Sequence, residues 1–240
     1  MPGSVDYLFS LFGFLFEAAF VVCLIRQKAS GRYFALGLYM LSSFVLSIVR
    51  YVILLQLGFL SDQYIYFYYY SDAFLTICLF LVLISLFQIV FEDMGIRRHL
   101  RVGALLLLGG TAWFSYMVVL RVATDPGLSW KMTTRFVVEM SQNLYFVGVV
   151  LTYLLWFATA TMRENRSRLI QIVLALGIYF SAFAANYAFR DLYPQFRAIW
   201  LYVPPVMGVA LPLAWFIAFI HTPEEARLAT ARVVPAPRHH

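Results

Sequence analysis

Long apolar runs, separated by short segments that hold most of the charged and turn-forming residues, repeat along the whole chain. A helix needs about 20 consecutive apolar residues to cross the hydrocarbon core of a bilayer. The runs predict seven transmembrane helices, over Tyr7–Ile25, Tyr33–Gln56, Tyr66–Phe91, Val102–Leu120, Phe136–Ala160, Leu169–Phe189 and Ala198–Ile220. The expected fold is therefore an all-α polytopic membrane protein, with residues 1–221 as one seven-helix domain and 222–240 as a short cytoplasmic tail.

The basic residues predict how this bundle is oriented. The segments after the first, third and fifth runs and the tail together hold 12 Lys and Arg residues, against five on the opposite side, and Arg50 lies within a run. Cytoplasmic loops of membrane proteins carry an excess of Lys and Arg. We therefore expect the N-terminus outside and the C-terminus in the cytoplasm of a plasma membrane, the inner membrane in a bacterium. The first run lacks a basic leader and contains Glu17, so we expect a permanent span and not a signal peptide.

Composition supports this picture and excludes others. Hydrophobic residues make up 62% of the 240 residues and charged residues 12%, whereas soluble domains carry about a quarter charged residues. The net charge of +6 does not indicate nucleic-acid binding, because the basic residues form short clusters between apolar runs. Both cysteines, Cys23 and Cys78, lie inside apolar runs, which argues against a disulfide framework. The expected partner is the lipid bilayer.

Ionisable residues at membrane depth are the most informative positions, because a charge near the bilayer centre costs about 2.5–3.5 kcal/mol. With a rise of 1.5 Å per residue, Arg50 lies about 7–8 Å, Asp72 about 9 Å and Glu139 about 13 Å above the midplane on the outer side. Arg50 and Asp72 belong to consecutive antiparallel spans, so we expect an ion pair between them. Glu17, near the midplane, is expected to be neutral and hydrogen-bonded to a neighbouring helix.

Further polar side chains lie at similar heights in the fifth and sixth spans, and they predict a polar pocket that opens to the outer side. The candidate ligand-binding residues are Arg50, Asp72, Glu139, Asn143, Asn186 and Arg190. The alternative is that the Arg50–Asp72 pair only holds two helices in register, since buried pairs often serve specificity.

The seventh span contains Pro204, Pro205 and Pro212. Each proline removes an N–H and frees the carbonyl group four residues earlier, here those of Trp200, Leu201 and Gly208. The prolines predict a kinked helix, which acts either as a static packing feature or as a hinge facing the pocket.

Several chemistries are excluded by the residues that they require. A retinal Schiff base needs an intramembrane lysine, but Lys28 and Lys131 both lie in loops. Haem and zinc sites need histidines within the spans, where none occurs. The chain has no nucleophile elbow, P-loop or metalloprotease motif. We therefore expect no cofactor and no metal, and an enzyme is the less favoured class.

The stretches FLFEAAFVVCLIRQ, YIYFYYYSDAF and GIRRHLR are similar to a family of uncharacterised bacterial seven-helix membrane proteins. The resemblance covers nearly the whole chain as a pattern of spans and a few polar positions. It implies the same topology, with an acid in the first span and another early in the third, which correspond to Glu17 and Asp72. It implies no particular activity.

Three functions fit these observations. The leading hypothesis is a receptor-like or sensory protein that binds a small molecule from outside and signals through a cytoplasmic partner at the basic loops. A small-solute or proton-coupled transporter is the second, and it requires a polar path on both sides of the midplane, for which only Glu17 is evidence. The third is a structural or assembly protein in which the buried charges only fix helix register.

Overall fold

The computed structural model describes residues 4–27, 31–58, 61–92, 97–122, 129–161, 167–193, 195 and 202–221, and within them it contains seven α-helices. They are α1 (Ser4–Arg26), α2 (Phe34–Leu57), α3 (Asp62–Val90), α4 (Arg97–Val122), α5 (Ser129–Thr161), α6 (Ser167–Leu192) and α8 (Val203–His221). Each helix overlaps one predicted run, so the all-α class and the seven helices are confirmed. Six of them, α2 to α6 and α8, are long and apolar enough to cross a membrane. The exact number of spans and the orientation stay predictions, and the tail lies outside the described residues.

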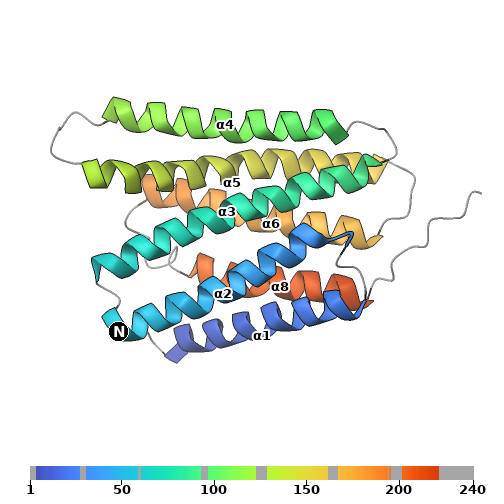
Figure 1. The fold of residues 1–240 in the computed structure, drawn as a ribbon, viewed down its shortest axis with the longest axis horizontal. Coiled ribbons are helices and arrows are strands. Elements are labelled where there is room, and N and C mark those ends of the chain that lie inside the picture. Colours follow the sequence, from blue (N-terminus) through green and yellow to red (C-terminus); the bar gives the residue numbers. More distant parts are fainter. Residues whose placement is uncertain are drawn as a thin grey trace, which may run out of the picture.

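The helices lie side by side with alternating direction (Figure 1). Around the bundle, α1 contacts α2, α2 contacts α3, α3 contacts α5, α5 contacts α6, α6 contacts α8, and α8 returns to α1. These contacts close a ring, and α4 packs outside it against α5 and α3. We call the end where α1, α3, α5 and α8 finish the basic end, and the opposite end, where α2 finishes and α3 begins, the Arg50 end.

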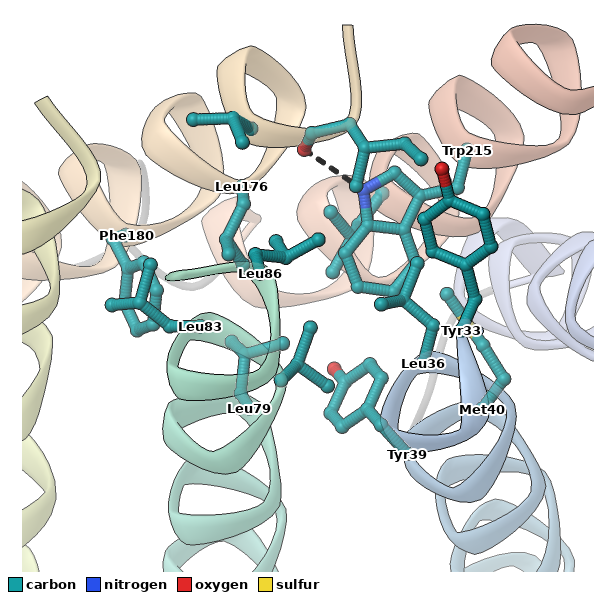
Figure 2. Close-up of a cluster of buried hydrophobic side chains, with 14 of the residues drawn as sticks. Tyr33, Leu36, Tyr39, Met40, Leu79, Leu83, Leu86, Leu176, Phe180 and Trp215 are labelled. Atoms are coloured by element: carbon teal, nitrogen blue, oxygen red, sulfur yellow. Dashed lines mark hydrogen bonds between the residues drawn. The ribbon is translucent and has the colours of Figure 1, made fainter. Parts of the chain in front are cut away.

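The centre of the ring towards the basic end is packed with aromatic and aliphatic side chains (Figure 2). Trp215 of α8 is fully buried, and its indole Nε1 donates a hydrogen bond to the main-chain oxygen of Ile172 at 3.2 Å. A buried tryptophan needs such an acceptor for its N–H group. Phe20 of α1 and Tyr39 of α2 pack against the same ring, with centroid distances of 5.9 and 6.0 Å. The indole therefore joins α1, α2, α6 and α8.

The outer surface is the apolar one. Leu105 and Leu106 of α4 are each 71% exposed, and large apolar side chains are exposed along the other helices as well. Glu17, Asn186 and Arg168, in contrast, are buried inside the bundle. In water this arrangement would be unfavourable, but in a bilayer the apolar surface faces lipid and the polar groups bond to one another.

The helix ends follow local sequence signals. Gly58 caps the C-terminus of α2 with φ of 78°, a conformation that L side chains rarely adopt, and its N–H bonds to the main-chain oxygen of Leu54. The side chain of Ser61 then accepts the N–H of Tyr64 at 3.2 Å and caps the start of α3. This cap starts α3 at Asp62, four residues before the predicted span.

The proline prediction needs correction. Because α8 begins at Val203, Pro204 and Pro205 lie in its first turn, where main-chain N–H groups have no partner within the helix in any case. Only Pro212 lies inside the helix and leaves the Gly208 carbonyl without its helical donor. Trp200 and Leu201, whose carbonyls the other two prolines were expected to free, lie outside the described residues.

At the basic end, the carbonyl group of Phe219 joins three helices. Its oxygen accepts a hydrogen bond from Gln27 Nε2 at 2.7 Å and from the guanidinium of Arg168 at 3.5 Å. The same guanidinium lies over the Phe219 ring, 4.9 Å from its centroid. A cation is favoured there, because the last carbonyls of a helix carry partial negative charge.

Candidate functional site

Arg50, near the end of α2, makes three contacts with the first turns of α3. Its Nε donates to Ser71 Oγ at 2.7 Å, and one Nη2 N–H donates to the main-chain oxygen of Tyr68 at 3.3 Å. The guanidinium also lies over the Tyr68 ring, 4.7 Å from the centroid. A cation over an aromatic face is stabilised by the ring quadrupole. The arginine is thereby held inside the bundle with its planar end directed at α3.

The expected ion pair is not formed directly: in the part of the chain that the structure describes, no salt bridge joins Arg50 to Asp72. Successive residues of a helix point about 100° apart. Because Ser71 faces α2 and bonds to Arg50, Asp72 is directed to another side of α3. The two charges still interact electrostatically. Residue counting along the two spans is consistent with Arg50 lying beside this part of α3, but it could not predict which side of α3 carries Asp72.

Asp72 lies one turn before Thr76, on the face of α3 that contacts α5. The hydroxyl of Thr76, one turn later in α3, donates to the main-chain oxygen of Asp72 at 2.9 Å and lies 3.1 Å from the hydroxyl of Tyr145 in α5. Since α3 and α5 run in the same direction, the residues one turn before Thr76 and one turn before Tyr145 also lie level with each other. Asp72 and Ser141 are therefore at the same height. The Asp72 carboxylate is within electrostatic range of Tyr145 and Tyr187.

The helix α6 contributes to the same level. The rings of Tyr145 and Phe183 are stacked, with centroids 4.8 Å apart and planes 12° apart. The helices α5 and α6 run in opposite directions. Ser141, one turn before Tyr145 on α5, is therefore level with the residues one turn after Phe183 on α6. Asn186 and Tyr187 lie at that turn. We call the group at this height the polar layer: Arg50, Ser71, Asp72, Ser141, Asn186 and Tyr187.

The polar layer has unmet hydrogen-bonding capacity. Ser141 and Asn186 are 2% and 8% exposed, and within the described residues Ser141 Oγ and Asn186 Oδ1 have no hydrogen-bond partner. No described residue donates to the Asp72 carboxylate either. A buried polar atom without a partner costs about 1–3 kcal/mol. Three groups from three helices, all able to accept a hydrogen bond, thus lie at one height of the bundle.

The other predicted ligand-binding residues do not converge there. Asn143 donates to Ser115 Oγ of α4 at 2.9 Å, and Glu139, one turn earlier in α5, lies on that same side of the helix. These two residues are therefore turned towards α4, the helix outside the ring, and a ligand-binding role for the six predicted residues stays a prediction. Arg190 is exposed and lies over the Tyr187 ring at 5.1 Å, at the rim of the polar layer.

Three residues of the site and its surroundings were not predicted from the sequence: Ser141, Tyr145 and Tyr187. A signal was present, because Ser141 and Tyr145 are four residues apart and so share one face of a largely apolar helix. On the sixth span, Asn186 and Tyr187 are adjacent polar residues in the same way. Whether this group binds a ligand stays a prediction.

Glu17 lies deeper, between α1 and α2. It is 6% exposed, its Oε1 accepts from Ser43 Oγ at 2.5 Å, and its Oε2 has no hydrogen-bond partner among the described residues. The expected hydrogen bond to a neighbouring helix is therefore confirmed. Tyr39 is within electrostatic range of both Glu17 and Asp72, and it also interacts with Tyr179 of α6. On α2, Tyr39 lies one turn from Ser43 on the side of the basic end, whereas Arg50 lies on the side of the polar layer.

Two grooves lie on the outer surface of the bundle, away from the polar layer. One groove lies along α4 beside Trp113, Phe114 and Met117, and another lies between α2 and α3 beside Leu41 and Phe74. Both are lined mainly by apolar side chains of the lipid-facing surface. No group of three or more His, Cys, Asp or Glu side chains comes together as a metal site within the residues that the structure describes.

A bundle of long apolar helices, with its apolar side chains outside and its polar ones inside, defines a multi-pass membrane protein. No known protein family, no curated protein and no solved structure matches the chain. The resemblance to bacterial seven-helix proteins has no support from these comparisons.

Proposed function

We propose that the protein is a receptor-like or sensory protein of the plasma membrane, the inner membrane in a bacterium, that binds a small polar solute in the polar layer. The observation that carries the proposal is that Ser141 and Asn186, at the height of Asp72, each have a buried acceptor atom with no partner among the described residues. In the orientation that the basic residues favour, the Arg50 end is outside. The solute would therefore enter from the exterior.

Binding is favoured over catalysis by the kinds of groups in the polar layer. A carboxylate, a hydroxyl, an amide and a guanidinium orient a solute through hydrogen bonds. The solute would contact α2, α3, α5 and α6 together, so binding would draw these helices into one arrangement. Since α6 packs against α8, a shift would reach the Phe219 carbonyl at the basic end, where a cytoplasmic partner would respond.

Solute-dependent thermal stability in lipid nanodiscs tests this function. A solute that binds only the folded protein raises its unfolding midpoint, and about 100 Kd of free solute adds about 2.7 kcal/mol. We expect one class of small polar solutes to stabilise the wild type but neither Asp72→Asn nor Arg50→Gln. Asn143→Ala, which alters α5 on its α4 side, is the matched control and should respond as the wild type does. Absence of stabilisation across metabolites, ions and lipids would contradict the proposal.

A proton-coupled transporter is the second candidate, and Glu17 is the observation that favours it. This buried acid and Tyr39 extend the polar groups from the polar layer towards the bilayer centre. Uptake of the stabilising solute into proteoliposomes, with and without a pH gradient, separates the candidates. A sensor binds without uptake, whereas a carrier accumulates the solute and loses gradient-driven accumulation in Glu17→Gln.

A further inference from the structure

We infer that the ligand of the polar layer is a small zwitterion that carries one ammonium and one carboxylate group, as a free amino acid does. This inference rests on the proposed binding function and adds the chemical class of the ligand. It follows from matching the unused donors and acceptors of the polar layer to the groups that would satisfy them.

The acceptors select the ammonium group. An ammonium has three N–H donors and no acceptor. Asp72, Ser141 and Asn186 offer three acceptors from α3, α5 and α6, and two of these residues are more than nine-tenths buried with an unpartnered oxygen. The rings of Tyr145 and Tyr187, which lie beside these groups, add favourable electrostatics for a cation. A neutral hydroxyl could meet only one of these acceptors.

The guanidinium of Arg50 selects the carboxylate. A guanidinium has five N–H donors in a planar fork, and Arg50 uses its Nε for Ser71 and one Nη2 N–H for Tyr68. The remaining N–H groups match the two oxygens of a carboxylate. Arg190 at the rim adds a second positive charge. A simple amine would meet repulsion from both arginines, and a simple acid would leave the acceptors unpaired.

Binding of glycine and L-alanine to the purified protein in nanodiscs tests the assignment, by calorimetry and by the unfolding midpoint. The matched probes are N-acetylglycine, which lacks the ammonium, and glycinamide, which lacks the carboxylate, with sodium chloride alone as the ion control. We expect binding of at least one amino acid and at least tenfold weaker binding of both blocked probes, because each loses a charged hydrogen-bonding group.

Variants locate the effect. Ser141→Ala and Asn186→Ala should each weaken amino-acid binding about tenfold, since each removes one hydrogen bond to an ammonium group. Ser42→Ala, in the lipid-facing groove of α2, and Asn143→Ala should bind as the wild type does. Should one variant of the polar layer fail to fold, the other carries the test, with folding judged from the midpoint without ligand.

Each contrary outcome has a distinct meaning. Equal binding of glycinamide and glycine, or of N-acetylglycine and glycine, overturns the zwitterion. Stabilisation by another solute class, lost in Asp72→Asn but with no response to any amino acid, overturns the ligand class and leaves the proposed function standing. A protein that responds to no solute at all loses both the ligand class and the proposed function.

Discussion

Each polar atom inside this bundle can bond only to protein, water or a bound solute, because lipid tails offer neither donors nor acceptors. Arg50 meets this requirement through Ser71 and the main chain of Tyr68. Glu17 meets it with one oxygen, through Ser43, whereas its second oxygen has no partner among the described residues. The residues with unmet capacity are therefore the ones from which function can be argued.

Ser43→Ala tests the bond to Glu17. The substitution leaves the Glu17 carboxyl without its only described hydrogen bond, so we expect a loss of about 1–3 kcal/mol in the free energy of unfolding. Ser42→Ala, the neighbouring serine on the lipid side, should change stability by less than about 0.5 kcal/mol. The measurement is reversible unfolding in bicelles.

The double variant Glu17→Leu with Ser43→Ala tests the same hydrogen bond by removing both of its partners. It should recover much of the stability, because replacing both partners of a buried hydrogen bond by apolar groups is often nearly neutral. Equal effects of Ser43→Ala and Ser42→Ala would show that the Glu17 bond contributes nothing.

The sequence predicted which polar residues lie within the helices better than it predicted which residues they contact. Counting residues along a helix predicts depth, and it identified Arg50, Asp72 and Glu17 as intramembrane polar groups. It does not predict the rotation of one helix against the next. Asn143 therefore bonds to Ser115 of α4 and not to the interior of the ring.

Helix pairs in this bundle are brought together by specific small residues. A Cβ atom added at Gly148 of α5 would lie 2.5 Å from the fully buried ring of Phe180 in α6, whereas at Gly110 of α4 it would meet nothing within 4 Å. Small residues at such crossings let two helix backbones approach closely. The glycine at 148 thus allows the close approach of α5 and α6, the helices that carry Ser141 and Asn186.

Gly148→Ala is expected to lower the free energy of unfolding by about 1–3 kcal/mol, because the new methyl group would force the fully buried ring of Phe180 to shift. Gly110→Ala makes the same chemical change on an open face and should be neutral or slightly stabilising. Unfolding in bicelles compares the two. A neutral Gly148→Ala would mean that α5 and α6 are not packed as closely as described.

The elements themselves could be predicted well, because apolar runs of about 20 residues leave few alternatives to a transmembrane helix. The ends of these helices could not be predicted from the sequence. α3 begins at its Ser61 cap, outside the apolar run, and α8 begins at Val203, so that Pro204 and Pro205 initiate the helix. A proline near the end of an apolar run is compatible with either a kink or a helix start, and only the position of the first turn decides.

The whole molecule differs between its two ends. Towards the Arg50 end, the interior of the ring holds the polar layer, with unpaired acceptors from α5 and α6. Towards the basic end it is filled by Trp215, Phe219 and their aromatic neighbours, and Arg168 is bonded to the carbonyl of Phe219. Neither the ring nor the outside position of α4 could be predicted from the sequence, since apolar runs do not say which helices touch. The difference between the polar Arg50 end and the aromatic basic end is the reason to expect a solute to enter from one side only.

Side-specific labelling of Ser141→Cys tests that central claim most directly. Cys23 and Cys78 are first replaced by alanine, and oriented membrane vesicles are treated with a membrane-impermeant cationic methanethiosulfonate reagent. Gln63→Cys, on the exposed first turn of α3, reports access at the Arg50 end, and Ser42→Cys, on the lipid side, should stay unlabelled. We expect Ser141→Cys to be labelled only from the side that labels Gln63→Cys, and to be protected by the stabilising solute. Labelling from the basic end, or no labelling from either side, would contradict a solute site open to the Arg50 end.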